Sequence, residues 1–336
     1  MNATAETTAL TESLRSLGLA ARDEEPLYQV LTGGVSSQIW RVDLRAGPVC
    51  VKRALPKLRV EREWLAPIER NRYEVAWLRV VSSIAAHAVP RMIAQDAEQN
   101  LFVMEFLAPE SHPLWKTELR SGRADPAFAA QLGRLLALIH RNTAHNSAIA
   151  AEFPTDAIFH SLRLEPYLEA TALRHPDLAP ILHRLVEITA ASKHALVHGD
   201  VSPKNILVGP QGPVLLDAEC AWYGDPAFDL AFCLNHLLLK CLWTPAASAD
   251  FLICFDAMRE AYLEGVAWEP AGVLEARAAA LLPALFLARV DGKSPVEYLT
   301  AADQDRARGV ARRLIPAGPE RLETIRKAWA KELKNA

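Results

Sequence analysis

The residues whose types and spacing best suit catalysis lie in one segment of the chain. The tripeptide His-Gly-Asp begins at His198 and follows an apolar run, and Asn205 comes five residues after Asp200. A second apolar run, a turn rich in Gly and Pro, and a third apolar run then lead to Asp217, with Glu219 two residues on. Two such runs around a turn are typical of a β-hairpin. We therefore expect Asp217 to return close to Asn205 and Asp200.

This set of side chains has a recognisable chemical use. Asn205 and Asp217 offer hard oxygen ligands, which suit Mg²⁺ far better than zinc, and Glu219 is a further candidate ligand. Asp200 is then left to accept a proton from an attacking hydroxyl, which is the division of labour in phosphoryl transfer. The alternative is an ordinary hairpin with charged ends. The intervals of the four oxygen-bearing residues favour the phosphoryl-transfer site.

The same segment resembles the catalytic and metal-binding loops of kinases. Gly199 stands where protein kinases have arginine, and Asp217-x-Glu219 stands where they have Asp-Phe-Gly. In both respects the chain is similar to the aminoglycoside phosphotransferase and choline kinase superfamily. That resemblance implies a protein-kinase-like α+β fold with two lobes and ATP and Mg²⁺ as cofactors. It also implies that His198 and Asp229 support the catalytic loop.

Composition limits the remaining classes of function. The 336 residues are enough for two lobes, and a net charge of −3 argues against a nucleic-acid partner bound through bulk charge. The five cysteines lack metal-site spacing and are expected to be reduced core thiols in the cytoplasm. The N-terminal residues have no signal-peptide core, and we expect no membrane partner because no uncharged apolar run reaches about 18 residues.

The N-terminal part predicts a nucleotide-binding lobe. Two β-rich runs flank Gly33 and Gly34, whose backbone amides could approach phosphates, although a plain β-turn explains these glycines equally well. The next strand ends in Lys52, where kinases place the lysine that contacts the α- and β-phosphates. Glu74 lies on a predicted helix and is the expected partner of Lys52. Taken alone, each charge could equally be a solvated surface group.

The end of this lobe is predicted from a further pair of strands. The second of these strands, 101–106, leads out of the lobe. In kinases the backbone at this place binds the adenine edge of the nucleotide. The corresponding residues of this chain are Glu105 and Leu107. We expect residues 1–108 to form a small β-rich nucleotide-binding lobe. Residues 109–336 are expected to form a large, mainly helical lobe for catalysis and substrate binding.

The helices of the second lobe are predicted from capping signals and apolar periodicity. Asp125 and Asp225 each precede a proline, which is a typical helix start. One helix is expected over Asp156–Leu173, ahead of the catalytic loop. Asn235 and His236 lie on the helix that follows Asp225, where packing is at least as plausible as substrate contact.

A closer resemblance is to methylthioribose kinases. These kinases have a tryptophan-bearing loop, which is followed by basic residues and by the glutamate of the next helix. In this chain Trp64, Arg70, Arg72 and Glu74 have a similar spacing. In that family the loop closes over the nucleotide, and an arginine near a glycine contacts the substrate later in the chain. The resemblance assigns that substrate contact to Arg289, and Trp64 is a further candidate for substrate contact.

The function that we expect is an ATP-dependent small-molecule kinase. It would transfer the γ-phosphoryl group to a substrate hydroxyl, with a sugar or sugar-like alcohol as first choice; Asp291 and Lys293 are lesser substrate candidates. One alternative is an antibiotic-modifying phosphotransferase, whose polycationic substrates need an acidic pocket. Another is a non-catalytic nucleotide-binding scaffold, which the complete set of motif residues disfavours. The sequence leaves the acceptor's identity and the oligomeric state open.

Overall fold

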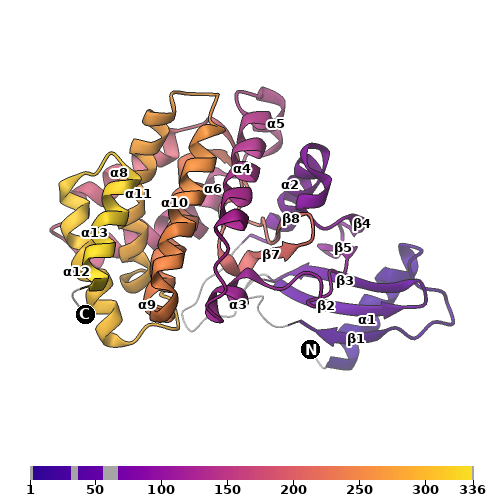
Figure 1. Ribbon diagram of the computed structural model, residues 1–336. Helices are drawn as coiled ribbons and strands as arrows, with labels where there is room; N and C mark the ends of the chain where they lie inside the picture. Colours follow the sequence, from indigo (N-terminus) through magenta and orange to yellow (C-terminus); the bar gives the residue numbers. More distant parts are fainter. Residues whose placement is uncertain (1–2, 32–36, 56–66, 335–336) are drawn as a thin grey trace. The chain divides into compact units, whose positions relative to one another are not determined.

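The computed structural model describes residues 3–31, 37–55 and 67–334. The chain divides into two compact units, Met1–Ala108 and Pro109–Ala336. The first unit is built on a β-sheet and the second is mainly helical (Figure 1). This division agrees with the expected α+β class.

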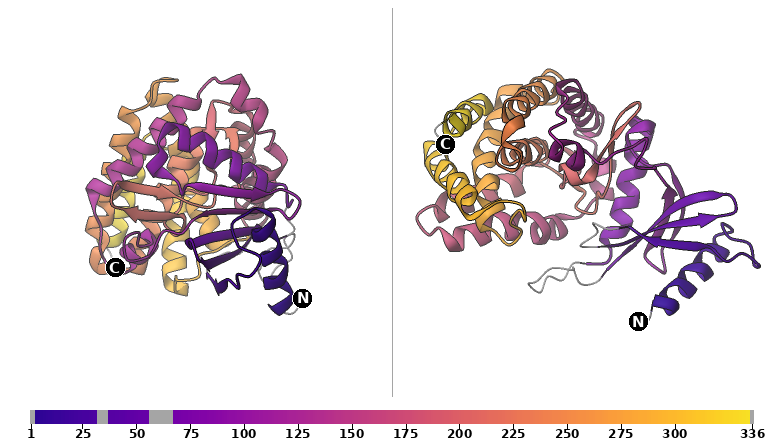
Figure 2. Two further views of the ribbon diagram at one scale, coloured as in Figure 1. Left: turned by 90° about the vertical axis from the view of Figure 1, so that its right-hand side faces the viewer. Right: turned by 60° about the horizontal axis from the view of Figure 1, so that its bottom comes forward.

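The first unit contains one five-stranded antiparallel sheet with the strand order β1-β2-β3-β5-β4. Its elements, in chain order, are α1 (Ala3–Ser16), β1 (Leu27–Val30), β2 (Ser37–Leu44), β3 (Gly47–Ala54), α2 (Arg70–Ile84), η1 (Ala86–Ala88), β4 (Met92–Asp96) and β5 (Leu101–Glu105). The helix α1 lies alongside the strands of this sheet (Figure 2).

The alternation of side chains along β3 decides where Lys52 points. Val51 packs in an apolar cluster with Leu10 and Leu14 of α1 and with Val103 of β5. Successive side chains of a strand point to opposite faces, so Lys52 points away from α1. On that side the helix α2 supplies the carboxylate that binds the Lys52 ammonium group.

The second unit combines many helices with two short two-stranded sheets. Its elements, in chain order, are α3 (Trp115–Arg120), α4 (Pro126–Thr143), α5 (Ser147–Glu152), α6 (Asp156–Phe159), η2 (His160–Glu169), α7 (Ala170–Arg174), α8 (Ala179–Ala191), β6 (Ala195–Val197), η3 (Pro203–Asn205), β7 (Ile206–Gly209), β8 (Gly212–Leu215), β9 (Trp222–Gly224), α9 (Pro226–Trp243), η4 (Pro245–Ala247), α10 (Ser248–Glu264), α11 (Ala271–Asp291), α12 (Ala301–Ala317) and α13 (Leu322–Lys334).

The helix α9 is the centre of the helical unit. Its residues are buried on all sides as far as Leu242, which is the pattern of a core helix. The helices α10 and α11 both pack on α9, and α10 also packs on α4 while α11 packs on α12. The expected starts of α4 and α9 are confirmed, because Asp125 and Asp225 accept hydrogen bonds from the amides two residues on, at 2.8 and 3.0 Å.

The helix α11 is also long and apolar enough, by length and composition alone, to cross a membrane, and 67% of that stretch is buried inside the protein. All five cysteines are buried and unpaired.

Two features differ from the sequence-based expectation. The continuous α-helix expected over Asp156–Leu173 is interrupted by η2, a π-helix that contains Pro166. Proline lacks an amide hydrogen and its ring clashes with the carbonyl four residues earlier in an α-helix, and the wider π-turn accommodates both effects. The segment after Glu219, expected as a loop, contains β9, which pairs with β6 through Val197 and Trp222.

Candidate active site

The hairpin of β7 and β8 brings the two ends of the motif segment together. Its register pairs Ile206 with Leu215, and the amide of Leu216 then donates to the carbonyl of Asn205 at 2.9 Å. Asp217 follows directly, close enough for its charge to act on the carboxyl group of Asp200. The fold-back expected from the sequence is therefore present.

A buried carboxylate holds the start of the catalytic loop. Asp229, in the first turn of α9, is fully buried, and its two oxygens accept from the amides of His198 at 2.7 Å and Gly199 at 2.8 Å. The ring of His140 lies 3.3 Å from the same carboxylate. Two adjacent amides bound to one rigid carboxylate fix the direction in which the next residue, Asp200, leaves the strand.

The ring of His198 links the catalytic loop to the chain after β8. Its Nδ1 accepts from the amide of Asp200 at 3.1 Å, so the hydrogen is on Nε2, which donates to the carbonyl of Leu216 at 3.0 Å. Burial lowers the pKa of His198, against the raising effect of Asp229. A neutral imidazole with one donor and one acceptor fits both contacts, so His198 positions the loop.

Only glycine fits between His198 and Asp200. Gly199 has φ +76°, and a Cβ atom built there would lie 2.5 Å from the carbonyl oxygen of Cys220. Protein kinases place arginine at this point of the motif, so the close approach of Cys220 gives a physical reason for the difference.

The carboxylate of Asp200 is held through one of its oxygens. Asp200 is 4% exposed, and its Oδ2 lies 2.8 Å from Asn205 Nδ2, 3.0 Å from an Arg163 nitrogen and 3.2 Å from Lys204 Nζ. Burial alone would raise the pKa of Asp200, but Arg163 and Lys204 lower it below its ordinary value. The group is therefore an ionised carboxylate whose Oδ1 makes none of these contacts within the described chain.

Arg163 is a site residue that the sequence did not reveal. It lies on the π-helix η2, and besides Asp200 its guanidinium binds the carbonyls of Gly199 and Leu162. Its charge also lies over the rings of Tyr167 and Phe232, at 5.8 and 5.7 Å from their centroids. The available signal was a basic residue between leucines in an apolar helix, followed by a proline where the helix should continue.

The candidate metal ligands lie at the start of the hairpin and in the chain just after it. The amide nitrogen of Asn205 donates to the backbone and side chain of Asp200, which leaves its Oδ1 for a cation. Asp217 has φ +64°, a backbone conformation that is uncommon for residues other than glycine. Glu219 is 8% exposed. These hard oxygen donors fit Mg²⁺, although no group of three or more His, Cys, Asp or Glu that could hold a metal ion occurs within the described residues.

The residues expected to contact nucleotide lie in the first unit. Lys52 Nζ donates to Glu74 Oε1 at 2.7 Å, and the two side chains are only 2% and 3% exposed. Glu105 ends β5, where its amide donates to the carbonyl of Arg91 at 3.0 Å, and its carboxylate accepts from the amide of Arg91 at 2.7 Å. Leu107 follows β5 and is half-buried.

Three of the expected site residues lie outside the described residues. Gly33 and Gly34 belong to the expected phosphate-binding turn, and Trp64 belongs to the expected nucleotide-covering loop. Their roles stay predictions from the sequence.

Arg289 lies in the last turn of α11 and is joined to Arg163 through an aromatic ring. One of its terminal nitrogens binds Tyr167 Oη at 3.2 Å and Ser294 Oγ at 3.0 Å. Its guanidinium also lies 5.7 Å from the centroid of the Tyr167 ring, which is the ring that Arg163 contacts. Tyr167 therefore connects Arg289 with the arginine that holds Asp200.

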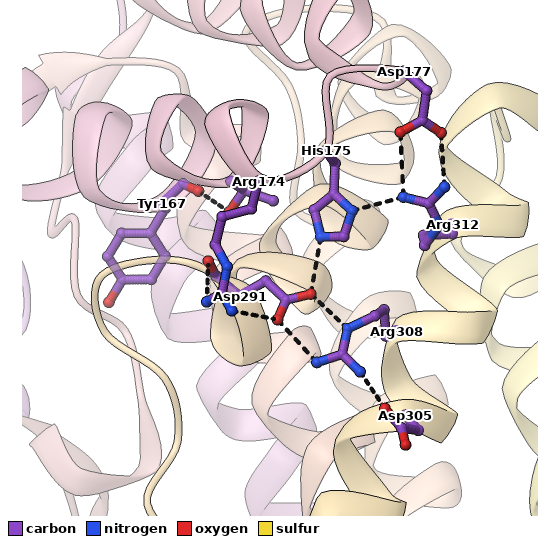
Figure 3. Close-up of polar contacts among 9 residues, drawn as sticks. Tyr167, Arg174, His175, Asp177, Asp291, Asp305, Arg308 and Arg312 are labelled. Atoms are coloured by element: carbon purple, nitrogen blue, oxygen red, sulfur yellow. Dashed lines mark hydrogen bonds and ion pairs between the residues drawn. The ribbon is translucent and has the colours of Figure 1, made fainter.

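Asp291 and Lys293, the lesser substrate candidates, are engaged in ion pairs. Both oxygens of Asp291 contact Arg308, at 2.7 and 2.9 Å, and Oδ2 also accepts from His175 Nε2 at 2.9 Å (Figure 3). The Lys293 ammonium group pairs with Glu165. Because these charges are already matched, the two residues brace the segment after Arg289.

Comparison with known proteins gives a consistent family. Residues 28–260 match the phosphotransferase enzyme family. A methylthioribose kinase of Escherichia coli O45:K1 is 29% identical over 235 residues, covering 60% of this chain and 55% of that protein. One of Yersinia enterocolitica serotype O:8 is 30% identical over 222 residues, covering 57% of this chain and 54% of that protein. The chain thus spans about half the length of the curated relatives that it matches.

Two solved structures share the fold. A choline/ethanolamine kinase family protein from Mesorhizobium loti aligns with a TM-score of 0.55 and 15% identity, covering 98% of this chain and 100% of that one. A spectinomycin phosphotransferase in complex with ADP and spectinomycin aligns with a TM-score of 0.52 and 12% identity, covering 96% of this chain and 98% of that one. The expected protein-kinase-like α+β fold is confirmed.

Proposed function

Since the chain belongs to the phosphotransferase enzyme family, we propose that it is an ATP-dependent kinase that phosphorylates a hydroxyl group of a small molecule. The acceptor is a sugar or sugar-like alcohol. The observation that carries this proposal is the half-engaged carboxylate of Asp200, whose Oδ2 is held by Asn205, Arg163 and Lys204.

Asp200 is the catalytic residue of this proposal. Its Oδ1 accepts the hydroxyl proton as the acceptor oxygen bonds to the γ-phosphorus and the bond to the bridging oxygen of ADP breaks. Arg163 and Lys204 keep the carboxylate ionised before the proton arrives. They also fix its orientation, and alignment of this kind supplies much of the rate of phosphoryl transfer.

Asn205 and Asp217 would hold Mg²⁺, with Glu219 as a further ligand. The metal would neutralise charge on the nucleotide phosphates. The positive φ of Asp217 supports this role, because a strained backbone at a polar residue is retained where the side chain must point in one direction.

The first unit would bind the nucleotide. Lys52 would contact the phosphates, and its ion pair with the buried carboxylate of Glu74 would fix it for that task. Glu105 and Leu107 would contact the adenine edge through their backbones, while Gly33 and Gly34 would lie over the phosphates and Trp64 would belong to a covering loop.

The second unit would bind the acceptor, with Arg289 in contact with it. The methylthioribose kinases among the relatives favour a sugar-like acceptor. An aminoglycoside is a polycation, whereas the cations Arg163 and Lys204 contact the catalytic carboxylate, which disfavours antibiotic modification. We place the enzyme in the cytoplasm, because its five buried cysteines are unpaired.

The test is ADP release with Mg²⁺ and ATP across a panel of sugars, thio-sugars, choline-like amines and aminoglycosides. We expect turnover with at least one sugar-like alcohol, loss of turnover when the metal is chelated, and loss of turnover in Asp200→Asn. A flat response across the panel together with tight ATP binding would instead establish the non-catalytic scaffold.

A further inference from the structure

The last turn of α9 carries a buried lysine that the catalytic residues do not explain. Lys240 is 2% exposed, and its ammonium nitrogen lies 4.0 Å from the ring centroid of Trp243 and 3.9 Å from that of Tyr298. The two rings stack on each other with centroids 4.4 Å apart. The amine is therefore held against aromatic surface in a defined place.

The charges around Lys240 are almost all positive. Lys116 and Arg120 also lie against the Trp243 ring, at 5.8 and 4.8 Å from its centroid. The nearby acid, Glu297, is paired with Lys116 at 2.6 Å, and within the described chain no carboxylate forms an ion pair with Lys240. Burial and the charge of Lys116 lower the pKa of Lys240 to about 6, as expected for a cation without a counter-ion.

Two further polar groups in this region lack partners. The Nε of Arg289 and the hydroxyl of Tyr298 are buried, and neither has a hydrogen-bond partner in the part of the chain that the structure describes. Buried polar groups are nearly always hydrogen-bonded. A ligand that supplies oxygen acceptors and negative charge would satisfy the two buried donors and pair with the protonated amine.

The same charges connect this region with the catalytic carboxylate. His236 lies one turn before Lys240 on α9. Burial lowers the pKa of His236 most, and the positive charges of Arg289, Lys240, Lys204 and Lys116 lower it further. Lys204 is the lysine that contacts Asp200. The positive groups therefore extend from the site of proton transfer to Lys240, all within the second unit.

We propose that Lys240, Arg289 and Tyr298, here called the anion subsite, bind an acidic group carried by the phosphoryl acceptor. The acceptor is then a sugar-like alcohol with a carboxylate or a phosphate ester, and not a neutral thio-sugar. This inference rests on the proposed kinase function and specifies its substrate class. A carboxylate or phosphate would pair with Lys240 and accept from Arg289 Nε and the Tyr298 hydroxyl.

The test compares neutral acceptors with related acceptors that carry an acidic group. Glycerol is matched with glycerate, and glucose with gluconate and glucose 6-phosphate, and kcat/KM is measured from ADP release for each. We expect at least one acid to exceed its neutral partner by about tenfold or more. The acid with the higher kcat/KM, a carboxylate or the phosphate ester, identifies the acidic group that the subsite binds.

Variants assign the preference to the subsite. Lys240→Met should lower the acid-over-neutral ratio of kcat/KM by about tenfold, and Tyr298→Phe, which removes only a hydroxyl, should lower it less. Lys327→Met changes a lysine of α13 that is 68% exposed and should leave the ratio unaltered.

The outcomes separate the two proposals. Turnover of neutral alcohols with no preference for acids, or a ratio that Lys240→Met and Tyr298→Phe both leave intact, would overturn the anion subsite while the kinase function stands. If no acceptor is phosphorylated, calorimetric binding of gluconate and glucose 6-phosphate decides. If the acids bind and both variants weaken that binding, the anion subsite stands and the kinase function is rejected. If the acids do not bind, both proposals are rejected.

Discussion

Asp200 and Asp291 are both buried carboxylates of the helical unit, at 4% and 3% exposure, and both contact arginine. In each case burial would raise the pKa and the surrounding donors lower it. They differ in how the donors are distributed. Arg308 binds both oxygens of Asp291, whereas the contacts to Asp200 all fall on Oδ2.

The network around Asp291 satisfies its members from several helices. His175 donates to Asp291 through Nε2, because its Nδ1 accepts from Arg312, which in turn pairs with Asp177 (Figure 3). The network joins the end of α11 to α12 and to the chain between α7 and α8. A fully engaged carboxylate of this kind braces structure, while one with an uncommitted oxygen can take part in a reaction.

The largest expected effect separates the two carboxylates by activity. Asp200→Asn should lower kcat about 10³-fold, because the proton acceptor is lost, while ATP binding persists. The variant should also be less stable than the wild type, because the buried guanidinium of Arg163 loses its charged partner, so kcat is compared under conditions in which both proteins are folded. Steady-state kinetics and urea unfolding provide the two readouts. Near-normal turnover in this variant would remove Asp200 from the mechanism.

The opposite effect on activity is expected for the structural carboxylate. Asp291→Asn should lower the free energy of unfolding by about 3 kcal/mol, because Arg308 loses a buried charged partner, and kcat should remain near the wild-type value. Urea unfolding with Asp305→Asn as a control tests this, since Asp305 is an exposed partner of the same arginine. A larger loss of stability in the control would contradict the assignment.

The arginine that holds Asp200 should have an intermediate effect on activity. Arg163→Met should lower kcat about 30-fold, because Asp200 loses the cation that orients it, and Arg163→Lys should recover part of the loss. The KM for ATP should stay the same, which distinguishes positioning of Asp200 from a role in nucleotide binding. An unchanged kcat with lowered stability would make Arg163 a purely structural residue.

The smallest effect concerns the dependence of stability on pH. The pKa of Asp291 is lower in the folded protein than in the unfolded chain, so its contribution is present above about pH 4 and is lost as the pH falls through the folded value. The unfolding free energies of the wild type and Asp291→Asn should therefore converge on acidification. Urea unfolding between pH 6 and pH 3 measures this, and a constant difference would show that the charge of Asp291 is not the source of the stability.

Local signals in the chain predicted much of the fold and part of the site. The hairpin that returns Asp217 to Asn205 follows from two apolar runs around a Gly- and Pro-rich turn. The starts of α4 and α9 follow from an aspartate placed before a proline. In these cases the interacting residues are close in sequence, so spacing and residue type are sufficient.

The partners of each buried charge were decided by the tertiary structure. Arg163 reaches Gly199 from 36 residues away and His175 reaches Asp291 from 116 residues away, and no local pattern encodes such pairs. The lack of an ion pair to Lys240 within the described residues likewise depends on which helices surround α9. The sequence by itself determined which groups could do chemistry, while packing determined which of them are neutralised, because the energy of a buried charge depends on neighbours brought together only by folding.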